Sequence, residues 1–394
     1  MLKDKRILLG ITGGIAAYKS VDLASKLTKS GAVVKTVMTR NACEFISPLL
    51  LKSITHQSVS VEQFNLNADI EHISLADWAE LLVIAPATAN IIGKAAGGIA
   101  DDLLSTIITA TISPILFVPA MNVHMYENKI VQRNIEILKK YGYFFAEPET
   151  GKLACGYEGK GRFPQVEEII YHIKTYLNYK GDLIGKKILV TAGATRENID
   201  PMRFISNYSS GKTGLALARA AFLRGAEVKF VAASVNENIP DYLDFVKTEN
   251  AAEMYETVMK LFPDYETVIM AAAVSDYTPE SPAERKIKKG ENLSLKLRRT
   301  NDILAEMGKR KGKNQKLIGF AAESENIEKN ALVKLEKKNL DFIVANDLKV
   351  AGKQETEIIL IGKDFRKKIT GDKFEVAHSI LDEIFGSGKG KINE

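Results

Sequence analysis

Apolar and polar positions form two successive series of short apolar runs separated by longer amphipathic stretches. In the first series, the amphipathic stretches 13–31 and 100–112 predict helices, the first with Gly31 as its C-cap. The short apolar runs have little alternation, which is typical of strands buried on both faces of a parallel sheet. These predicted strands cover residues 6–12, 32–39, 81–88 and 114–120.

The same pattern starts again after the polar, glycine-containing segment 180–187. Residues 357–385 predict a closing hairpin and helix. The other predicted strands are 188–193, 227–233, 265–274, 316–322 and 341–347, with helices at 211–226, 251–262 and 326–340. Strands that alternate with helices indicate an α/β fold. We predict a flavodoxin- or Rossmann-like parallel-sheet domain at 1–180, a linker at 181–187 and a second Rossmann-like α/β domain at 188–394.

Composition agrees with two globular domains. A chain of 394 residues is too long for one ordinary core, and its 45% hydrophobic and 26% charged content is that of a soluble protein. The net charge of +5 is too small to favour nucleic acid. Two cysteines make a disulfide framework improbable and favour the cytoplasm. Neither a signal peptide nor an apolar stretch of ~20 residues is visible, so no membrane association is expected.

Polar residues follow all four predicted strands of the first half, where open α/β sheets bind ligands. Glycines there let the backbone approach a phosphate. The run GITGGIAA lacks the GxGxxG pattern of dinucleotide sites, so a mononucleotide such as FMN fits better. Ordinary strand-to-helix turns are the alternative. The four segments are Thr12–Gly14, Thr39–Asn41, Ala87–Asn90 and Ala120–Asn122.

Three further residues of the first half are candidates for chemistry. His72 precedes a helix-like segment; histidine exchanges protons readily near neutral pH, although a lone histidine is more often filler. Asn122 follows a buried strand in PAMNVHMYEN and either caps the next helix or faces a ligand. Cys155 lies in a glycine-rich loop, where a protonated thiol is a candidate proton donor on a mobile flap.

The segments PAMNVHM, APATAN, LACGYEGKGR and the surroundings of His72 resemble the flavin-dependent cysteine decarboxylases. The resemblance implies bound FMN, which oxidises an N-acylated cysteine to a thioaldehyde before carbon dioxide leaves. It also implies homo-oligomers built from trimers. On this resemblance His72 is the base, Asn122 holds the substrate carboxylate and Cys155 donates a proton. The implied FMN-binding residues are Gly14, Ile15, Thr39, Thr88, Asn90 and Ala120.

Two motifs of the second half indicate anion binding. RFISNYSSGKTG fails as a P-loop because Ser206 stands where glycine is required. Residues 209–212 still open a helix, where they either bind an anion or provide a plain serine cap. In KIKK, strand alternation points Lys286 and Lys288 the same way. This run is either a solvated edge strand or a means of neutralising a triphosphate.

The motifs ISNxSSGKxG, AAAVxDY, KIKK, GFAAE and NLDFIVAND resemble phosphopantothenate–cysteine ligase, and the order of the halves is that of the bacterial bifunctional enzymes of coenzyme A synthesis. The resemblance implies that CTP activates 4'-phosphopantothenate as an acyl-cytidylate, which the cysteine amine then attacks. Asn207 would steady the acyl-cytidylate, Lys286 would stabilise charge on the phosphates, and Mg²⁺ would be held mainly by CTP. The implied nucleotide pocket is Ala272, Asp276, Lys286, Asn301, Asp302, Ile303, Leu304, Phe320, Lys334 and Lys338.

The expected substrates are therefore 4'-phosphopantothenate, cysteine and CTP, with the decarboxylase at 1–180 and the ligase at 188–394. Two residues depart from the family pattern: Asp102 stands where asparagine is usual, and Thr213 where methionine is expected. His124 has no assigned role. One alternative is a flavin prenyltransferase-like protein fused to a nucleotide-binding domain; another is a non-enzymatic flavoprotein regulator. The presence of Asn122 and Cys155 favours the enzyme.

Overall fold

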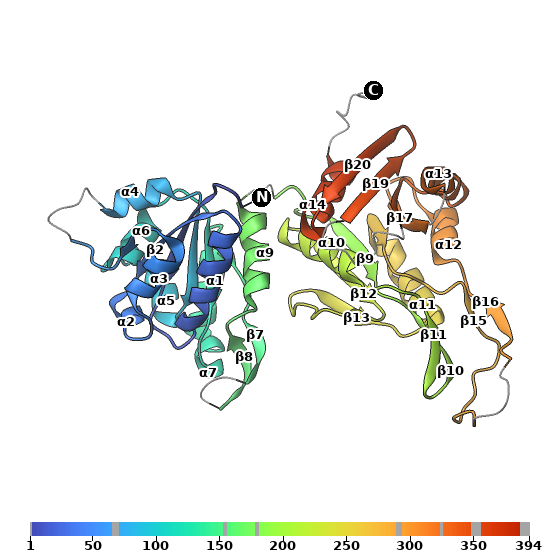
Figure 1. Ribbon diagram of the computed structural model, residues 1–394, viewed down its shortest axis with the longest axis horizontal. Coiled ribbons are helices and arrows are strands. Elements are labelled where there is room, and N and C mark those ends of the chain that lie inside the picture. Colours follow the sequence, from blue (N-terminus) through green and yellow to red (C-terminus); the bar gives the residue numbers. More distant parts are fainter. Residues whose placement is uncertain are drawn as a thin grey trace. The chain divides into compact units, whose positions relative to one another are not determined.

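The computed structural model describes residues 2–64, 71–152, 156–177, 181–288, 294–323, 326–347 and 356–386. The chain divides into two compact units, Met1–Tyr179 and Lys180–Glu394 (Figure 1). Each unit is an α/β structure around its own sheet. Among the described helices, none is both long enough and apolar enough to cross a bilayer.

The first unit contains a six-stranded parallel sheet with the order β3-β2-β1-β4-β5-β6. Its direction of winding reverses between β1 and β4, which is where such sheets bind ligands at their carboxyl edge. The predicted doubly wound parallel sheet is confirmed, and the short edge strands β3 and β6 are additions to it. The strands are β1 (Arg6–Ile11), β2 (Val33–Met38), β3 (Val59–Ser60), β4 (Leu81–Ala87), β5 (Ile115–Pro119) and β6 (Phe144–Phe145).

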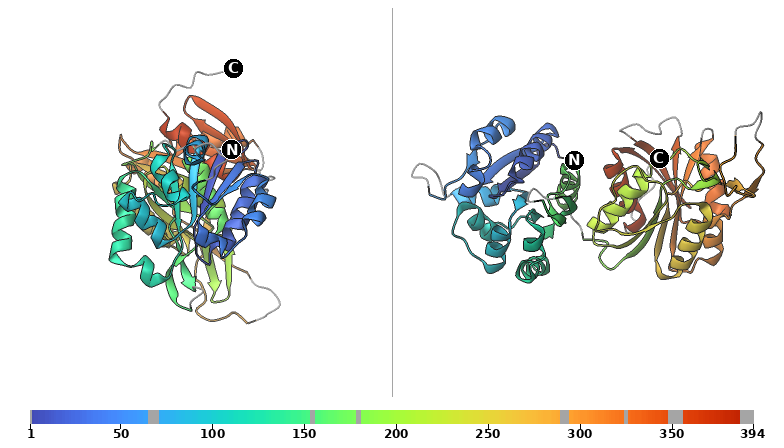
Figure 2. Two further views of the ribbon diagram at one scale, coloured as in Figure 1. Left: turned by 90° about the vertical axis from the view of Figure 1, so that its left-hand side faces the viewer. Right: turned by 90° about the horizontal axis from the view of Figure 1, so that it is seen from below.

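Helices cover both faces of this sheet (Figures 1 and 2). On one face, Leu8 and Phe117 pack with Leu75, Ile91 and Leu104 from three helices. On the other, α1 and α9 contact β4. Burial on both faces explains the continuous apolar runs. The helices are α1 (Ala17–Lys29), α2 (Arg40–Cys43), α3 (Pro48–Thr55), α4 (Glu71–Trp78), α5 (Ala89–Gly97), α6 (Leu103–Ala110), α7 (Val123–Tyr126), α8 (Lys129–Lys140) and α9 (Val166–Tyr176); a hairpin, β7 (Glu149–Lys152) and β8 (Glu158–Arg162), precedes α9.

The second unit contains an eight-stranded sheet with the order β13-β12-β9-β14-β17-β18-β19-β20. The strands through β18 are parallel, and β19 and β20 form the predicted closing hairpin. The second Rossmann-like fold is thus confirmed, with an antiparallel extension. The strands are β9 (Lys187–Ala192), β12 (Glu227–Ala232), β13 (Asp244–Lys247), β14 (Thr267–Met270), β17 (Lys316–Glu323), β18 (Phe342–Asp347), β19 (Thr356–Gly362) and β20 (Phe365–Gly371).

Alternate residues of its central strand point into two separate cores. Val190 packs with Leu217 of α10, whereas its neighbour Leu189 packs with Val258 of α11 and Met307 of α12. The helices are α10 (Lys212–Leu223), α11 (Ala251–Leu261), α12 (Ile303–Arg310), α13 (Ile327–Lys337) and α14 (Lys373–Phe385), with a 3-10 turn η1 (Phe262–Asp264). Two small hairpin sheets add β10 (Arg196–Asp200) with β11 (Arg203–Ser206), and β15 (Tyr277–Pro279) with β16 (Leu297–Arg299).

The expected linker, 181–187, is attached to the second unit, although most of its residues are exposed. Leu183 is fully buried in the core formed with α10 and α14, and Lys187 already belongs to β9. The polar residues of this segment suggested an unattached linker, but its apolar residue Leu183 attaches it to the core of the second unit. A second anchor is Asp182, which pairs with the buried guanidinium of Arg224.

We expect Arg224→Met to lower the free energy of unfolding of the second unit by about 2 kcal/mol. The Arg224 side chain is 4% exposed, lies 2.9 Å from Asp382 and donates to the carbonyl oxygen of His378 at 3.2 Å. Methionine keeps the aliphatic volume but makes none of these bonds. Differential scanning calorimetry measures the change. Arg366→Met, at an exposed pair with Glu328, is the control and should shift stability by less than about 0.5 kcal/mol; equal shifts would contradict the anchoring role.

Two candidate active sites

Three of the four predicted strand ends of the first unit meet at one edge of its sheet. Thr12 Oγ1 donates to the carbonyl oxygen of Pro86 at 2.7 Å and accepts from the Thr88 N–H at 3.2 Å. A Cβ added to Gly13 would lie 2.4 Å from Asn41 Cβ, and one added to Gly14 would lie 3.5 Å from Thr88 Cγ2. The loops after β1, β2 and β4 therefore touch, as the ligand hypothesis requires.

The residues predicted to hold FMN lie along these loops. Thr39 caps α2 by accepting from the Ala42 N–H at 3.3 Å, and Thr88 stands at the N-cap of α5 with no side-chain capping bond. Ile15 is 62% exposed. A glycine turn, a hydroxyl at a helix start and exposed apolar surface fit a phosphate and a flat ring system. Of the two other residues predicted to hold FMN, Asn90 is exposed and Ala120 is half-buried.

Asn122 lies at the same edge, just beyond β5. Its Oδ1 accepts from the His124 N–H at 2.8 Å, so it caps the short helix α7. The capping interpretation of Asn122 is confirmed. A residue at this position also lies where sheets of this kind bind ligands, so capping and ligand binding are compatible. The substrate-binding role stays a prediction.

The hairpin β7–β8 packs directly against α7. A Cβ added to Gly159 would lie 2.6 Å from Val123 Cγ2, and the N–H of Met121 donates to the carbonyl oxygen of Gly161 at 3.0 Å. The ring of His124 meets that of Tyr157 edge-on, with 5.0 Å between centroids. His124, unassigned from the sequence, therefore contacts the glycine-rich segment. Cys155 lies outside the described residues.

His72 and Asp102 also take definite places. His72 is half-buried in the first turn of α4, next to Glu71, which accepts a hydrogen bond from Ser60 of β3. Asp102 caps α6 by accepting from the Ser105 N–H at 2.8 Å and lies 2.7 Å from Lys94 Nζ. An asparagine would cap this helix equally well but would lose the ion pair. The Asp102 departure thus has a structural explanation.

The carboxylate of Glu147 connects α7, α8 and β8. It accepts from the Tyr126 hydroxyl at 2.9 Å and lies 3.0 Å from the ammonium groups of both Lys139 and Lys160. Burial alone would raise the pKa of Glu147, but the two lysines outweigh burial and lower the pKa to about 2. This cluster fixes α7, which Asn122 caps, to the hairpin that packs on it.

We expect Glu147→Gln to destabilise the first unit by roughly 3 kcal/mol at pH 7, from a folded pKa of about 2 against the ordinary 4.5. A depressed carboxyl pKa stabilises the fold above the ordinary pKa, and this stability is lost as pH falls toward 2. The variant should therefore show a flatter stability profile between about pH 5 and pH 3. Urea denaturation, followed by fluorescence of Trp78, the single tryptophan, measures both effects. Glu44→Gln, at an exposed position, should retain the normal profile.

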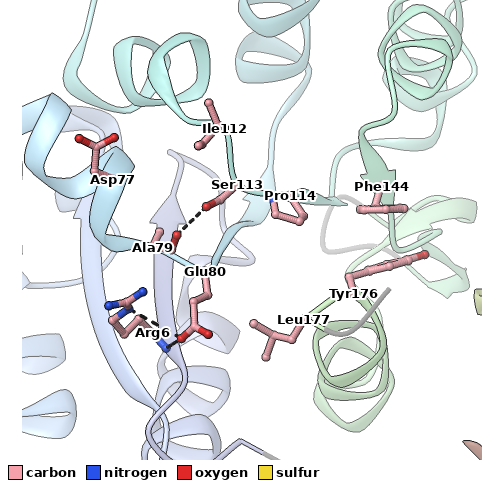
Figure 3. Close-up of a pocket in the computed structure, with 10 residues that line it drawn as sticks. All are labelled: Arg6, Asp77, Ala79, Glu80, Ile112, Ser113, Pro114, Phe144, Tyr176 and Leu177. Atoms are coloured by element: carbon pink, nitrogen blue, oxygen red, sulfur yellow. Dashed lines mark hydrogen bonds and ion pairs between the residues drawn. The ribbon is translucent and has the colours of Figure 1, made fainter. Parts of the chain in front are cut away.

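A cavity of about 700 Å³ in the first unit lies away from these residues (Figure 3). Arg6 and Glu80 come from the amino ends of β1 and β4, at the sheet edge opposite the predicted FMN residues. Among the residues that the structure describes, no predicted site residue lines it. The cavity is lined by Arg6, Asp77, Ala79, Glu80, Ile112, Ser113, Pro114, Phe144, Tyr176 and Leu177.

In the second unit, part of the predicted site lies beyond the end of β14. Asn207 Nδ2 lies 3.3 Å from the carbonyl oxygens of both Ala273 and Val274. The Thr300 N–H donates to the carbonyl oxygen of Asp276 at 3.0 Å, which brings the segment that starts at Asn301 to the same place. Motifs far apart in the sequence therefore converge.

Two buried threonines that sequence reasoning missed hold this region. Thr191 Oγ1 accepts from the Ala272 N–H at 3.2 Å, and Thr195 Oγ1 accepts from the Ser275 N–H at 3.0 Å. Both are fully buried. Hydroxyl-bearing residues at the end of an apolar strand were the available signal. Their bonds fix the backbone of the predicted nucleotide pocket.

Two members of that pocket form an ion pair. Lys338 Nζ lies 2.8 Å from Asp302 Oδ2, and Asp302 also caps α12 by accepting from the Ala305 N–H at 3.0 Å. Burial would raise the pKa of Asp302, but the Lys338 ammonium and the Ala305 N–H lower it overall. The remaining members are the buried Ile303 and the half-buried Leu304, Phe320 and Lys334.

The start of α10 differs from one expectation. Its N-cap is Gly211, with φ of 72° and no side-chain capping bond, so the plain serine cap is wrong. A Cβ at Gly211 would lie 2.8 Å from Val235 Cγ2, which explains why glycine fits this close approach. Ser209 and Ser210 are half-buried just before it, and Thr213 lies half-buried in the first turn.

The strand predicted for KIKK is also wrong for residues 286–288, which form no strand. The Ile287 N–H donates to Asp200 Oδ2 at 3.1 Å, and its carbonyl oxygen accepts from Arg203 Nη2 at 2.6 Å. Side chains therefore satisfy the backbone groups that a sheet ladder would use. Lys286 is exposed beside this contact, and Lys289 lies outside the described residues.

Two family models match the chain in succession. The model described as "Flavoprotein" matches residues 1–178. The model described as "DNA/pantothenate metabolism flavoprotein C-terminal domain" matches residues 183–387. Each match covers one unit of the structure.

Curated relatives match across nearly the whole chain. The coenzyme A biosynthesis bifunctional protein CoaBC of Bacillus subtilis (strain 168) is 45% identical over 401 aligned residues, covering 99% of this chain and 98% of the relative. The protein of that name from Borreliella burgdorferi is 44% identical, covering 98% and 100%. The Escherichia coli (strain K12) protein is 40% identical, covering 88% and 87%.

Solved structures resemble each half separately. The C-terminal domain of a coenzyme A biosynthesis bifunctional protein is 40% identical and covers 52% of this chain and 97% of its own, with a TM-score of 0.45. A PPC decarboxylase mutant complexed with pantothenoylaminoethenethiol is 31% identical and covers 45% and 100%, with a TM-score of 0.41. From the full-length identities and the two family models together, the chain belongs to the family of bifunctional coenzyme A biosynthesis proteins.

Proposed function

We propose that the protein makes 4'-phosphopantetheine in two steps. The second unit joins cysteine to 4'-phosphopantothenate, and the first unit decarboxylates the joined product. This proposal rests on the match to a coenzyme A biosynthesis bifunctional protein, 45% identical and covering 99% of this chain, and is supported by the contacts among the loops after β1, β2 and β4 and by those of Asn207 beyond β14. Fold alone would not support it, since similar sheets host many activities.

In the first unit, FMN is the proposed cofactor and supplies the redox chemistry when bound. The loops after β1, β2, β4 and β5 would hold it. The Asn122 amide would bind the carboxylate that leaves as carbon dioxide, His72 would take a proton from the substrate, and Cys155 would return one to the product. The proposed FMN residues are Gly14, Ile15, Thr39, Thr88, Asn90 and Ala120.

In the second unit, the carboxylate of 4'-phosphopantothenate attacks the α-phosphate of CTP, and pyrophosphate leaves. The cysteine amine then attacks the acyl carbon of the resulting acyl-cytidylate, and CMP leaves. Asn207 would steady the acyl-cytidylate, and the Lys286 ammonium would offset the charge that develops on the phosphates. Mg²⁺ would be carried mainly by the triphosphate.

The active form is proposed to be a homo-oligomer built from trimers of the first unit. Large apolar side chains of this unit are exposed, and such surface marks association or ligand sites. Sedimentation velocity should give a mass that is a multiple of three chains; a monomer would contradict this arrangement. The exposed apolar residues of the first unit include Ile15, Tyr18, Phe45 and Leu49, which are 62%, 61%, 51% and 68% exposed, respectively.

The experiment that tests the proposed chemistry compares nucleotides. Pyrophosphate release in the presence of 4'-phosphopantothenate and cysteine should require CTP and be far slower with ATP; equal rates would contradict CTP as the cosubstrate. The purified protein should also carry FMN, identified after heat release. A flavin prenyltransferase-like protein or a regulator would bind flavin without turning over an acyl-cysteine.

A further inference from the structure

We propose that Asp200 and Arg203 are a positioning pair that fixes the backbone beside Lys286 and thereby sets the affinity of the ligase for its nucleotide. This inference rests on the proposed function, because it assigns the pair to the segment that presents Lys286. Asp200 lies outside the sequence motifs, and Arg203 opens the run RFISNYSSGKTG but had no role assigned to it. Both lie on the hairpin β10–β11, which contacts β15 (Figure 1).

The Asp200 carboxylate is buried, and both of its oxygens accept hydrogen bonds. Its side chain has no exposed surface. Oδ1 accepts from the N–H groups of Met202 at 2.8 Å and Arg203 at 2.9 Å. Oδ2 accepts from Arg203 Nε at 3.0 Å and from the Ile287 N–H at 3.1 Å. A buried carboxylate costs free energy unless it is paired and hydrogen-bonded, and this one is both.

The pair holds Ile287 from both sides. Asp200 accepts from its N–H, and Arg203 Nη2 donates to its carbonyl oxygen at 2.6 Å. A third bond joins the Ala283 N–H to the carbonyl oxygen of Ile199 at 2.9 Å. Residues 281–288 belong to no helix or strand. Contacts with the hairpin therefore supply order that secondary structure does not.

The electrostatics keep this connection in place over a wide pH range. Burial would raise the pKa of Asp200, but the N–H groups of Met202 and Ile287 and the Arg203 guanidinium outweigh burial and lower the pKa to about 2. The carboxylate therefore remains an acceptor at neutral pH. Fixing the backbone next to Lys286 confines where its long, exposed side chain can reach, which is preorganisation for a charged ligand.

Asp200→Asn in the full-length protein tests this role. The NH₂ group of the new amide replaces an oxygen that accepts hydrogen bonds, so the bond from the Ile287 N–H is lost. The side chain at position 200 keeps its size. We expect the KM for CTP to rise by about tenfold to 100-fold, more than kcat falls. Decarboxylation of added phosphopantothenoylcysteine should be unchanged. Hydrogen exchange of the Ile287 amide should accelerate by about tenfold or more, because its acceptor is gone.

Two further variants complete the test. Asp244→Asn removes an exposed carboxylate, 67% accessible, that pairs with Lys229 at 2.7 Å; it should leave CTP binding and Ile287 exchange unchanged. Arg203→Lys keeps the positive charge but cannot bond Asp200 and Ile287 at the same time as the guanidinium does. It should therefore raise the KM for CTP as Asp200→Asn does. If Asp200→Asn does not fold, the KM of Arg203→Lys for CTP tests whether the pair sets nucleotide affinity.

Faster exchange at Ile287 with an unchanged KM for CTP would overturn the inference. So would equal loss of both activities in soluble Arg203→Lys, since that indicates general unfolding. If the unmodified protein released no pyrophosphate with CTP, the proposed function would fail instead. In that case the exchange measurement would still decide whether the pair fixes the backbone at Ile287.

Discussion

Replacing Lys286 by glutamine is expected to slow ligation by about 100-fold or more while decarboxylation continues at its normal rate. Glutamine keeps much of the side-chain length but carries no charge, so it cannot offset the negative charge that builds on the reacting phosphates. Removal of one such stabilising group commonly costs 10²–10³ in rate. All the residues proposed for ligation also belong to the second unit, whose core is separate from that of the first.

Two assays on the same preparation measure this result. Pyrophosphate release with CTP reports ligation, and carbon dioxide release from added phosphopantothenoylcysteine reports decarboxylation. Lys368→Gln is the control and should leave both rates unchanged, since it changes an exposed lysine of β20 that is outside the proposed pocket. Equal loss of both activities in Lys286→Gln would contradict the division of labour between the units.

Replacing Asn122 by aspartate is expected to have the converse effect, with decarboxylation reduced by about 100-fold or more and ligation unchanged. Aspartate is as good an N-cap as asparagine, so residue 122 should still cap α7. Its negative charge would repel the substrate carboxylate, and such opposition costs several kcal/mol, with each 1.4 kcal/mol worth about tenfold.

The capping contribution is separated from binding by Asn122→Ala, which removes both. The free energy of unfolding, followed by Trp78 fluorescence, should fall by about 1 kcal/mol in Asn122→Ala and remain near normal in Asn122→Asp. If Asn122→Asp decarboxylates at the normal rate, Asn122 is a cap alone and the carboxylate is held elsewhere.

Much of the fold was predictable because the central strands are buried on both faces. The run that became β4 is buried at every position, and β14 likewise, so their apolar character alone identified them. The small hairpins were not predictable in this way. The strand β7 is half-exposed along its length, and β16 is exposed throughout, so neither has an apolar face to signal it.

The position of Asn122 was predictable because it directly follows the buried strand β5, whereas Asn207 follows the small strand β11 and was identified only by the family resemblance. The predictions that were wrong or missing concern residues whose contacts are distant in the sequence. The supposed strand at 286–288 is held by Asp200, 87 residues earlier, and no local pattern announces that bond. Leu183 was hidden in a polar segment, and the contact of His124 with Tyr157 needed the folded hairpin.

The most direct measurement supplies the purified protein with 4'-phosphopantothenate, cysteine, CTP and Mg²⁺ and follows pyrophosphate and carbon dioxide together. We expect both to be released in equal amounts, with carbon dioxide lagging behind pyrophosphate, and omission of cysteine to abolish carbon dioxide release. Release of neither product by a flavin-loaded preparation would contradict the claim that this chain carries out both steps.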